Sequence, residues 1–106
     1  PGMSTPEDAP GAFWIAHVEV TDAEAYGRYA TLATQAIAEH GGVFLARGGR
    51  YRQLEGKARA RNVVARFPSF EAAVACYESP AYRAALEHAK GAALRDLVVV
   101  EETPRA

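Results

Sequence analysis

Alternation of apolar and polar side chains marks the first predicted element, a β-strand over Ala12–Val20 (AFWIAHVEV). Successive side chains of a strand point to opposite sides, so this segment has two faces. One face is wholly apolar and carries Trp14, Ala16, Val18 and Val20. The other face begins apolar and ends ionisable, with Phe13, Ile15, His17 and Glu19. The pattern predicts a sheet with one side in a dry core and a second side that meets something else.

A helical spacing of apolar residues follows this strand. Thr21 and Glu24 match a capping box at the start of a helix. Apolar side chains then recur every three to four residues and predict a helix over residues 22–40: Tyr26, Tyr29 or Ala30, Ala33, and Ala36 or Ile37. Gly41 and Gly42 end this helix, because glycine adopts the left-handed backbone that other residues avoid.

The rest of the chain adds three strands and a helix in two pieces. We expect a short strand over residues 43–47, a bulge or bend at residues 48–49, extended backbone over 50–54 and a turn over 55–58. A strand over residues 62–67 has Val63, Ala65 and Phe67 on one face and Asn62, Val64 and Arg66 on the other. Ser69 caps the next helix, and Ser79-Pro80 restarts it as far as residue 90, since serine followed by proline is a common helix start. The last strand is expected over residues 96–102.

This order of elements, βαββαβ, predicts an α+β fold of the ferredoxin-like type. Right-handed crossovers place the first and third strands at the centre of a four-stranded antiparallel sheet, with the helices on one face. The opposite face then carries Phe13, Ile15 and Val64 without a cover, which is more exposed apolar surface than most soluble monomers have. A second copy packed face to face is the simplest cover. We therefore expect a homodimer in which two sheets enclose a barrel with a cavity.

Four segments resemble a known family: WIAHVEVTDAEAYGRY, GGVFLARGG, FPSFEAAVACYESPAYRAA and DLVVVEE. They are similar to the small bacterial family of unknown function numbered thirteen-thirty. The resemblance implies the dimeric α+β barrel superfamily and no particular activity. Wider relatives in that superfamily include cofactor-free oxygenases, lactone isomerases, haem-degrading enzymes and ligand-sensing regulatory domains, and kinship at the level of the fold is only an analogy for function.

Composition and charge narrow the class of protein. The 106 residues fit one domain, which we expect over residues 12–102, after a disordered leader at 1–11 and before a tail at 103–106. Pro1-Gly2 before Met3 is interpreted as a remnant of expression. The net charge of -1 argues against a nucleic-acid binder. No apolar run approaches the roughly 20 residues of a membrane span, no secretory signal is present, and the single cysteine fits a reducing, cytoplasmic setting.

Polar residues on the uncovered face are the candidates for chemistry. Histidine is the residue type that most often serves as an acid, a base or a ligand, so His17 is the first candidate; the alternative is a hydrogen-bonded histidine without chemistry. Arg66, on this face, and Arg47, from the glycine-flanked corner, have guanidinium groups that bind a carboxylate through paired hydrogen bonds. The alternative for each arginine is a salt bridge with Glu19, Glu101 or Glu102. Asn62 adds an amide to the same face. The expected binding residues are His17, Arg47, Arg66 and Asn62, with Phe13 and Ile15 as the apolar wall.

Other reactive residue types receive structural interpretations. The tyrosines at helical spacing are expected to pack in the core: Tyr26, Tyr29, Tyr77 and Tyr82. Cys76 is expected to be a small buried residue without a base beside it. The three histidines have no spacing typical of metal ligands, and no glycine motif for a phosphate is present. We therefore expect neither a metal nor a cofactor.

Three functions remain open at this point. The first is a homodimer that binds a small organic molecule, with an anion among the options, in a cavity between the sheet and the dimer interface. The second is a cofactor-free monooxygenase- or isomerase-like enzyme, in which His17 moves a proton and an arginine steadies an enolate-like oxygen. The third is a structural or regulatory dimer module. The sequence does not identify a ligand, a reaction or a pathway.

Overall fold

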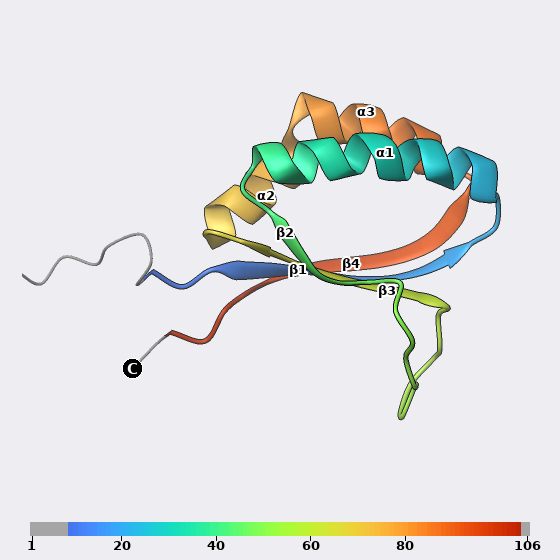
Figure 1. Cartoon of the computed structure of the whole chain (residues 1–106), viewed down its shortest axis with the longest axis horizontal. Coiled ribbons are helices and arrows are strands. Elements are labelled where there is room, and N and C mark those ends of the chain that lie inside the picture. Colours follow the sequence, from blue (N-terminus) through green and yellow to red (C-terminus); the bar gives the residue numbers. More distant parts are fainter. Residues whose placement is uncertain (1–8, 105–106) are drawn as a thin grey trace, which may run out of the picture.

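Three helices lie on one face of a four-stranded antiparallel sheet in the computed structural model, which describes residues 9–104 (Figure 1). The elements are β1 (Ala12–Val20), α1 (Ala23–Glu39), β2 (Val43–Arg47), β3 (Arg61–Phe67), α2 (Phe70–Glu78), α3 (Pro80–Ala89) and β4 (Ala93–Glu101). The strand order is β2-β3-β1-β4, so β1 and β3 form the central pair. The ferredoxin-like α+β prediction is confirmed, with its second helix divided into α2 and α3.

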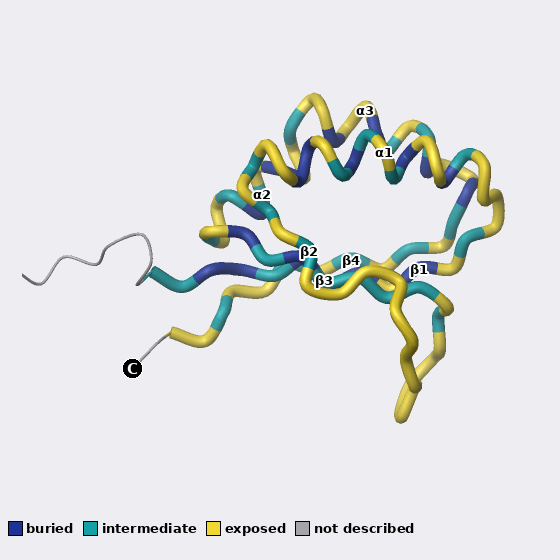
Figure 2. The backbone as a smooth tube through the Cα atoms, in the orientation of Figure 1, coloured by how far each residue is buried: buried dark blue, intermediate teal, exposed yellow. Residues whose placement is uncertain are grey.

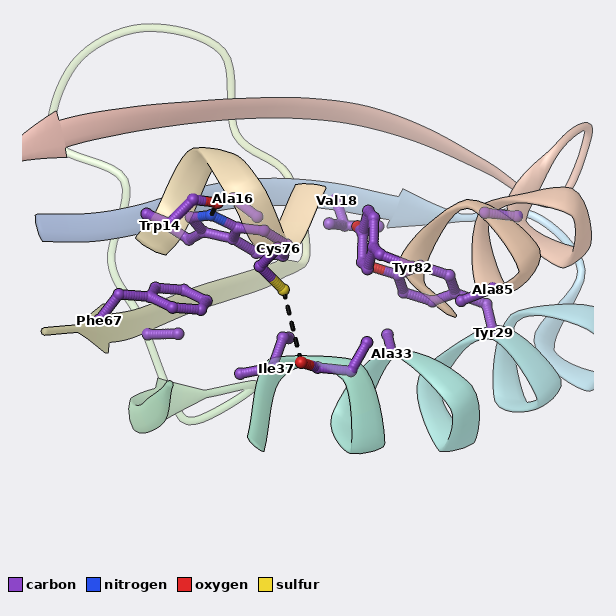
Figure 3. Close-up of a cluster of buried hydrophobic side chains, with 14 of the residues drawn as sticks. Trp14, Ala16, Val18, Tyr29, Ala33, Ile37, Phe67, Cys76, Tyr82 and Ala85 are labelled. Atoms are coloured by element: carbon purple, nitrogen blue, oxygen red, sulfur yellow. Dashed lines mark hydrogen bonds between the residues drawn. The ribbon is translucent and has the colours of Figure 1, made fainter. Parts of the chain in front are cut away.

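The covered face of the sheet and the helices enclose one apolar core (Figure 3). The Trp14 ring lies at its centre, with its centroid 5.1 Å from that of Phe67 and 4.9 Å from that of Tyr82. The Trp14 indole N–H donates to the Ala73 carbonyl at 2.9 Å, so this buried donor has a partner. The predicted assignment of the β1 faces therefore holds, because Trp14 and Val18 are buried while His17, between them, is exposed.

The ends of α1 show one correction to the predicted capping. Asp22, not Thr21, is the N-cap, and its carboxylate accepts from the Ala25 N–H at 3.2 Å. Thr21 lies between β1 and this cap, and the backbone N–H groups of Thr21 and Asp22 both donate to the Ala92 carbonyl, at 2.8 Å and 3.1 Å, next to the start of β4. At the other end, Gly41 has a φ of 81°, and the Gly42 N–H donates back to the Ile37 carbonyl at 2.8 Å.

The junction between α2 and α3 follows the predicted pattern. The Ser79 hydroxyl oxygen accepts from the Tyr82 N–H at 3.2 Å, and Pro80 occupies the first turn of α3. Ser69 caps α2 in the same way, accepting from the Ala72 N–H at 3.0 Å. Each serine satisfies a backbone donor that the first turn of a helix leaves free. The restart lets the chain change direction, so that α3 lies beside α1 (Figure 1).

The segment between β2 and β3 departs from prediction. The expected extended backbone at residues 50–54 is not a strand; residues 48–58 are all exposed and extend away from the sheet on the side opposite the helices (Figures 1 and 2). The bulge lies within β2 rather than at residues 48–49. Phe44 pairs with Ala65 and Ala46 pairs with Val64, so Leu45 is an extra residue between two consecutive pairs.

The sheet face opposite the helices, here called the open face, has no cover among residues 9–104 (Figure 1). Its outer strands expose large apolar side chains, including Val43 (61%) on β2 and Val98 (54%) on β4. Between them, Phe13 and Ile15 of β1 are half-buried. No helix in the described part of the chain is long and apolar enough to cross a membrane.

The two ends of the chain lie only partly within the described residues. Most of the expected leader, residues 1–8, and the last two tail residues, 105–106, are outside them. Gly11, assigned to the leader, is buried and tied to the sheet. Its N–H donates to the Glu102 carboxylate at 2.9 Å, and its carbonyl accepts from the Glu102 N–H at 2.8 Å.

Candidate functional site

Five of the six predicted binding residues lie on the open face. Strand pairing places His17 opposite Asn62 on one side and opposite Asp96 on the other. His17 Nδ1 and Asn62 Oδ1 are 2.6 Å apart, and the Asn62 amide nitrogen donates to the Arg59 carbonyl at 3.3 Å. Because the Asn62 amide nitrogen is turned toward Arg59, the Asn62 oxygen faces His17 and accepts from its Nδ1–H. In the neutral ring Nε2 is then an acceptor, and it has no hydrogen-bond partner within residues 9–104.

Arg66 lies on the same face and forms the salt bridge that was its alternative interpretation. Its guanidinium group donates to the Glu102 carboxylate from Nη2 at 2.9 Å and from Nε at 3.2 Å. These hydrogen bonds raise the pKa of Arg66 further above its usual value. Phe13 pairs with Arg66 across the strands and Ile15 pairs with Val64, so both belong to the apolar part of this face.

Arg47 lies on the other side of the sheet, so the expected grouping with His17 and Arg66 is wrong. The bulge at Leu45 shifts the register, and Arg47 pairs with Val63, whose side chain packs against the core. A shift of one residue sends a strand side chain to the opposite face. There Arg47 donates to the Thr34 hydroxyl at 2.6 Å and stacks over the Phe44 ring at 4.2 Å.

Arg47 lines a pocket between the sheet and α1, and strand register brings two further arginines into it. Arg61 of β3 and Arg95 of β4 pair with the buried Val18 of β1 from its two sides. Both arginines therefore face the helices, as Val18 does. Within residues 9–104, no salt bridge or hydrogen bond joins Arg47, Arg61 or Arg95 to a carboxylate. The apolar wall of the pocket comes from both layers and includes Trp14, Tyr26, Tyr29, Ala33, Phe44 and Leu97.

Two residues of this pocket, Tyr29 and Arg95, form a polar cluster with Tyr82 of α3. The Tyr29 and Tyr82 hydroxyl oxygens are 2.6 Å apart, and Arg95 Nη2 donates to them at 2.7 Å and 3.1 Å respectively. Arg95 also lies over the Tyr29 ring, at 4.7 Å from its centroid. Burial raises the pKa of Tyr29 and of Tyr82, although the Arg95 charge opposes this in both. Both hydroxyls therefore stay protonated at neutral pH and act as hydrogen-bond donors.

The pocket is narrow in this conformation. Its cavity volume is about 40 Å³, which holds a few water molecules. A second, shallower hollow lies on the open face beside Ile15, His17, Asp96 and Val98. The residues 9–104 contain no group of three or more His, Cys, Asp or Glu side chains that would hold a metal ion.

Sequence reasoning missed Arg61 and Arg95 and assigned Tyr29 and Tyr82 to packing alone. A signal for Arg95 was present, because it alternates in phase with Leu97 and Val99, which also face the helices. The expected start of the last strand at residue 96 concealed this alternation, since β4 begins at Ala93. Cys76 is buried as expected, and burial, with a contribution from Glu39, raises its thiol pKa to about 11.

Comparisons with known proteins identify a family and a fold. Residues 11–103 match a domain family described as Domain of unknown function (DUF1330). No curated protein matches the sequence.

Similar solved structures share the architecture at low sequence identity. A protein of unknown function from Rhodopseudomonas palustris is 22% identical with a TM-score of 0.72, over 91% of this chain and 85% of that one. SnoaB, a cofactor-independent oxygenase from Streptomyces nogalater, is 12% identical with a TM-score of 0.64, over 92% and 96%. A Bacteroides thetaiotaomicron protein of unknown function, described as a possible oxidoreductase, is 14% identical with a TM-score of 0.58, over 87% and 97%. These structural neighbours are of the dimeric α+β barrel type, and the likenesses show that this chain shares their fold.

Proposed function

This chain belongs to the DUF1330 family, and we propose that it is a homodimer that binds a small organic anion in the pocket between its sheet and α1. The supporting observation is that Arg47, Arg61 and Arg95 line one pocket and have no carboxylate partner within residues 9–104. A guanidinium group is charged at all physiological pH values and binds carboxylates through paired N–H donors. Three such groups beside an aromatic wall favour a ligand with an anionic end and an apolar body.

A ligand reaches this pocket by displacing the side chain of Arg47. That side chain is exposed, and its hydrogen bond to Thr34 lies at the surface, where the net cost of breaking one bond is about 1 kcal/mol. Such an opening enlarges the narrow space without disturbing the buried Trp14 and Phe67. The arginine then gains the ligand's anionic group in exchange for the threonine hydroxyl.

The partner in this proposal is a second copy that covers the open face. Val43, Val98 and Val100 are between 44% and 61% exposed there, beside the half-buried Phe13 and Ile15. A two-fold pair of such faces is self-complementary and buries the apolar patch. It also encloses the hollow beside His17. We place the protein in the cytoplasm, where a lone thiol such as Cys76 stays reduced.

An enzyme of the cofactor-free monooxygenase or isomerase kind is the second candidate. It is favoured by the fold shared with SnoaB and by the free Nε2 of His17, which is an acceptor available to move a proton. His17→Ala is expected to abolish turnover while the dimer stays folded. Unchanged turnover removes His17 from any mechanism. If both ligand screens and turnover assays are negative, the third candidate, a structural or regulatory dimer module, remains.

Thermal unfolding with a panel of small aromatic carboxylates tests the main proposal. A ligand that binds only the folded state raises the melting temperature. We expect Arg61→Gln to raise the dissociation constant of a hit by roughly 10- to 150-fold, because charge-assisted hydrogen bonds contribute about 1.5–3 kcal/mol. The matched control is Arg83→Gln, an exposed arginine on α3 outside the pocket. A panel without any shift, or equal effects of the two variants, contradicts the proposal.

A further inference from the structure

The cluster formed by Arg95, Tyr29 and Tyr82 has more hydrogen-bond donors than acceptors. The two hydroxyls carry one hydrogen each, and the Tyr29–Tyr82 contact uses only one of them. Arg95 has donors only, and its Nε is buried without a hydrogen-bond partner. An unpaired buried donor costs about 1–3 kcal/mol. The imbalance therefore favours an acceptor atom that is supplied from outside the chain.

The free hydrogen of this cluster can be directed into the pocket. Arg95 Nη2 donates to the Tyr29 oxygen at 2.7 Å. When Tyr82 also donates to that oxygen, the Tyr29 O–H is free to point elsewhere. Tyr29 and Arg95 both line the pocket, whereas Tyr82 is fully buried in the core. A ligand in the pocket therefore meets the side chains of Tyr29 and Arg95.

The spacing of these donors suits a single oxygen atom. Arg95 Nη2 and the two tyrosine oxygens lie within 3.1 Å of one another, so the donors that these contacts leave over, one tyrosine O–H and the Arg95 Nε–H, belong to one small cluster. Fixed donors around a point in a water-poor pocket are the arrangement that stabilises an oxyanion. Arg47 and Arg61 belong to β2 and β3, on the far side of β1 from Arg95, and serve a separate part of the ligand.

We propose that this cluster holds an acidic hydroxyl of the ligand, a phenol or an enol, in its ionised form. The inference rests on the proposed function, and it adds the ligand class and the atom that is bound. On binding, the O–H bond of the ligand breaks, its proton passes to solvent, and the electron pair stays on the oxygen beside Arg95. A positive charge within hydrogen-bond distance lowers the pKa of an acid by roughly 1–3 units. The pocket therefore ionises such a ligand at a pH where the free molecule is still protonated.

4-Nitrophenol is a suitable probe, because its ionised form absorbs visible light. The intact protein, in excess over the probe, is titrated with acid and base while the absorbance is followed. We expect the apparent pKa of the bound probe to fall by about one unit or more, a tenfold change in its ionisation equilibrium. Arg95→Gln and Tyr29→Phe are expected to remove most of the shift. Arg83→Gln and Tyr77→Phe, whose positions lie outside the pocket, are expected to keep it.

Benzoate binding, measured by calorimetry on the same samples, distinguishes failure of the oxyanion site from failure of the anion pocket. If benzoate binds and the pKa of 4-nitrophenol does not fall, the oxyanion site is refuted while the anion pocket stands. If neither molecule binds, the proposed function is refuted and this inference with it. Tyr29→Phe keeps the aromatic ring and its packing, so it decides the matter if Arg95→Gln fails to fold. A shift that persists in Tyr29→Phe and in Arg95→Gln also overturns the inference.

Discussion

Single side chains in this protein owe their chemistry to burial. The thiol of Cys76 is fully buried in the core and donates to the Ala36 carbonyl at 3.6 Å (Figure 3). Burial, with the charge of Glu39, raises its pKa from 9.0 to about 11, so the reactive thiolate is absent at neutral pH. Tyr29 and Tyr82 keep their protons for the same reason. In the core of this protein these groups act as neutral donors or packing atoms rather than as nucleophiles.

The raised thiol pKa predicts a pH dependence of stability. Between pH 9.0 and about 11 the unfolded chain releases the Cys76 proton while the folded chain retains it. Unfolding then releases a proton, so the free energy of unfolding falls as the pH rises through this range. Urea unfolding across that window should show a steeper decline for the native sequence than for Cys76→Ala. Parallel declines contradict the prediction, whatever the absolute stability of the variant.

At the scale of elements, the bulge in β2 decides which residues reach the pocket. The extra residue Leu45 moves Arg47 to the helix side of the sheet. Gly48 then ends β2 with a φ of 69°, and its N–H donates to the Asn62 carbonyl at 3.0 Å. A Cβ atom at Gly48 would lie 2.6 Å from Nη1 of Arg61. This corner therefore positions two of the three pocket arginines.

Substitution at the glycine pair tests the role of this corner. Gly48→Ala is expected to cost about 1–2 kcal/mol of stability, because alanine is strained at positive φ and its methyl group displaces the Arg61 side chain. Binding of an anionic ligand should weaken in parallel. Gly49→Ala is the matched control, since a Cβ there meets nothing within 4 Å and its φ is not positive. Equal stability of the two variants in urea unfolding is the outcome that contradicts this assignment.

At the scale of the whole molecule, the two sides of the sheet have different roles. The helices cover one side and leave a pocket with three arginines, whereas the other side is apolar at its centre and uncovered within residues 9–104. The same β1 strand serves both, through Val18 on one face and Ile15 on the other. Binding of a ligand and binding of a second copy are therefore separable by substitution.

A charge placed on the open face should separate the proposed dimer. Val98→Glu puts a carboxylate into the apolar patch, where burial against a second copy is costly unless the charge is paired. We expect sedimentation velocity at micromolar concentration to find a dimer for the native sequence and a folded monomer for the variant. Ala84→Glu, on the exposed side of α3, should remain dimeric. A native protein that sediments as a monomer refutes the proposed dimer.

Much of the fold was predictable because it depends on neighbours in the chain. Alternation in Ala12–Val20, glycines at the end of α1 and serine caps at residues 69 and 79 are local signals, and the structure contains each of these elements. Their order was enough to predict the sheet topology, since few crossovers are allowed. The local signals were less exact at the start of α1, where two adjacent capping residues are present and Asp22 rather than Thr21 is the cap.

The candidate site was much less predictable than the fold. His17, Asn62 and Arg66 lie on the face that alternation assigned to them. Arg47 was expected to join them from the glycine-flanked corner and does not, because the extra residue at Leu45 places it on the other side of the sheet. The amino-acid sequence by itself determined most of the elements, their order and the different character of the two β1 faces, since these follow from local periodicity. Only the tertiary structure decided that Arg95 meets Tyr29 and Tyr82, because strand register and helix packing join residues that are 66 and 13 positions apart in the chain.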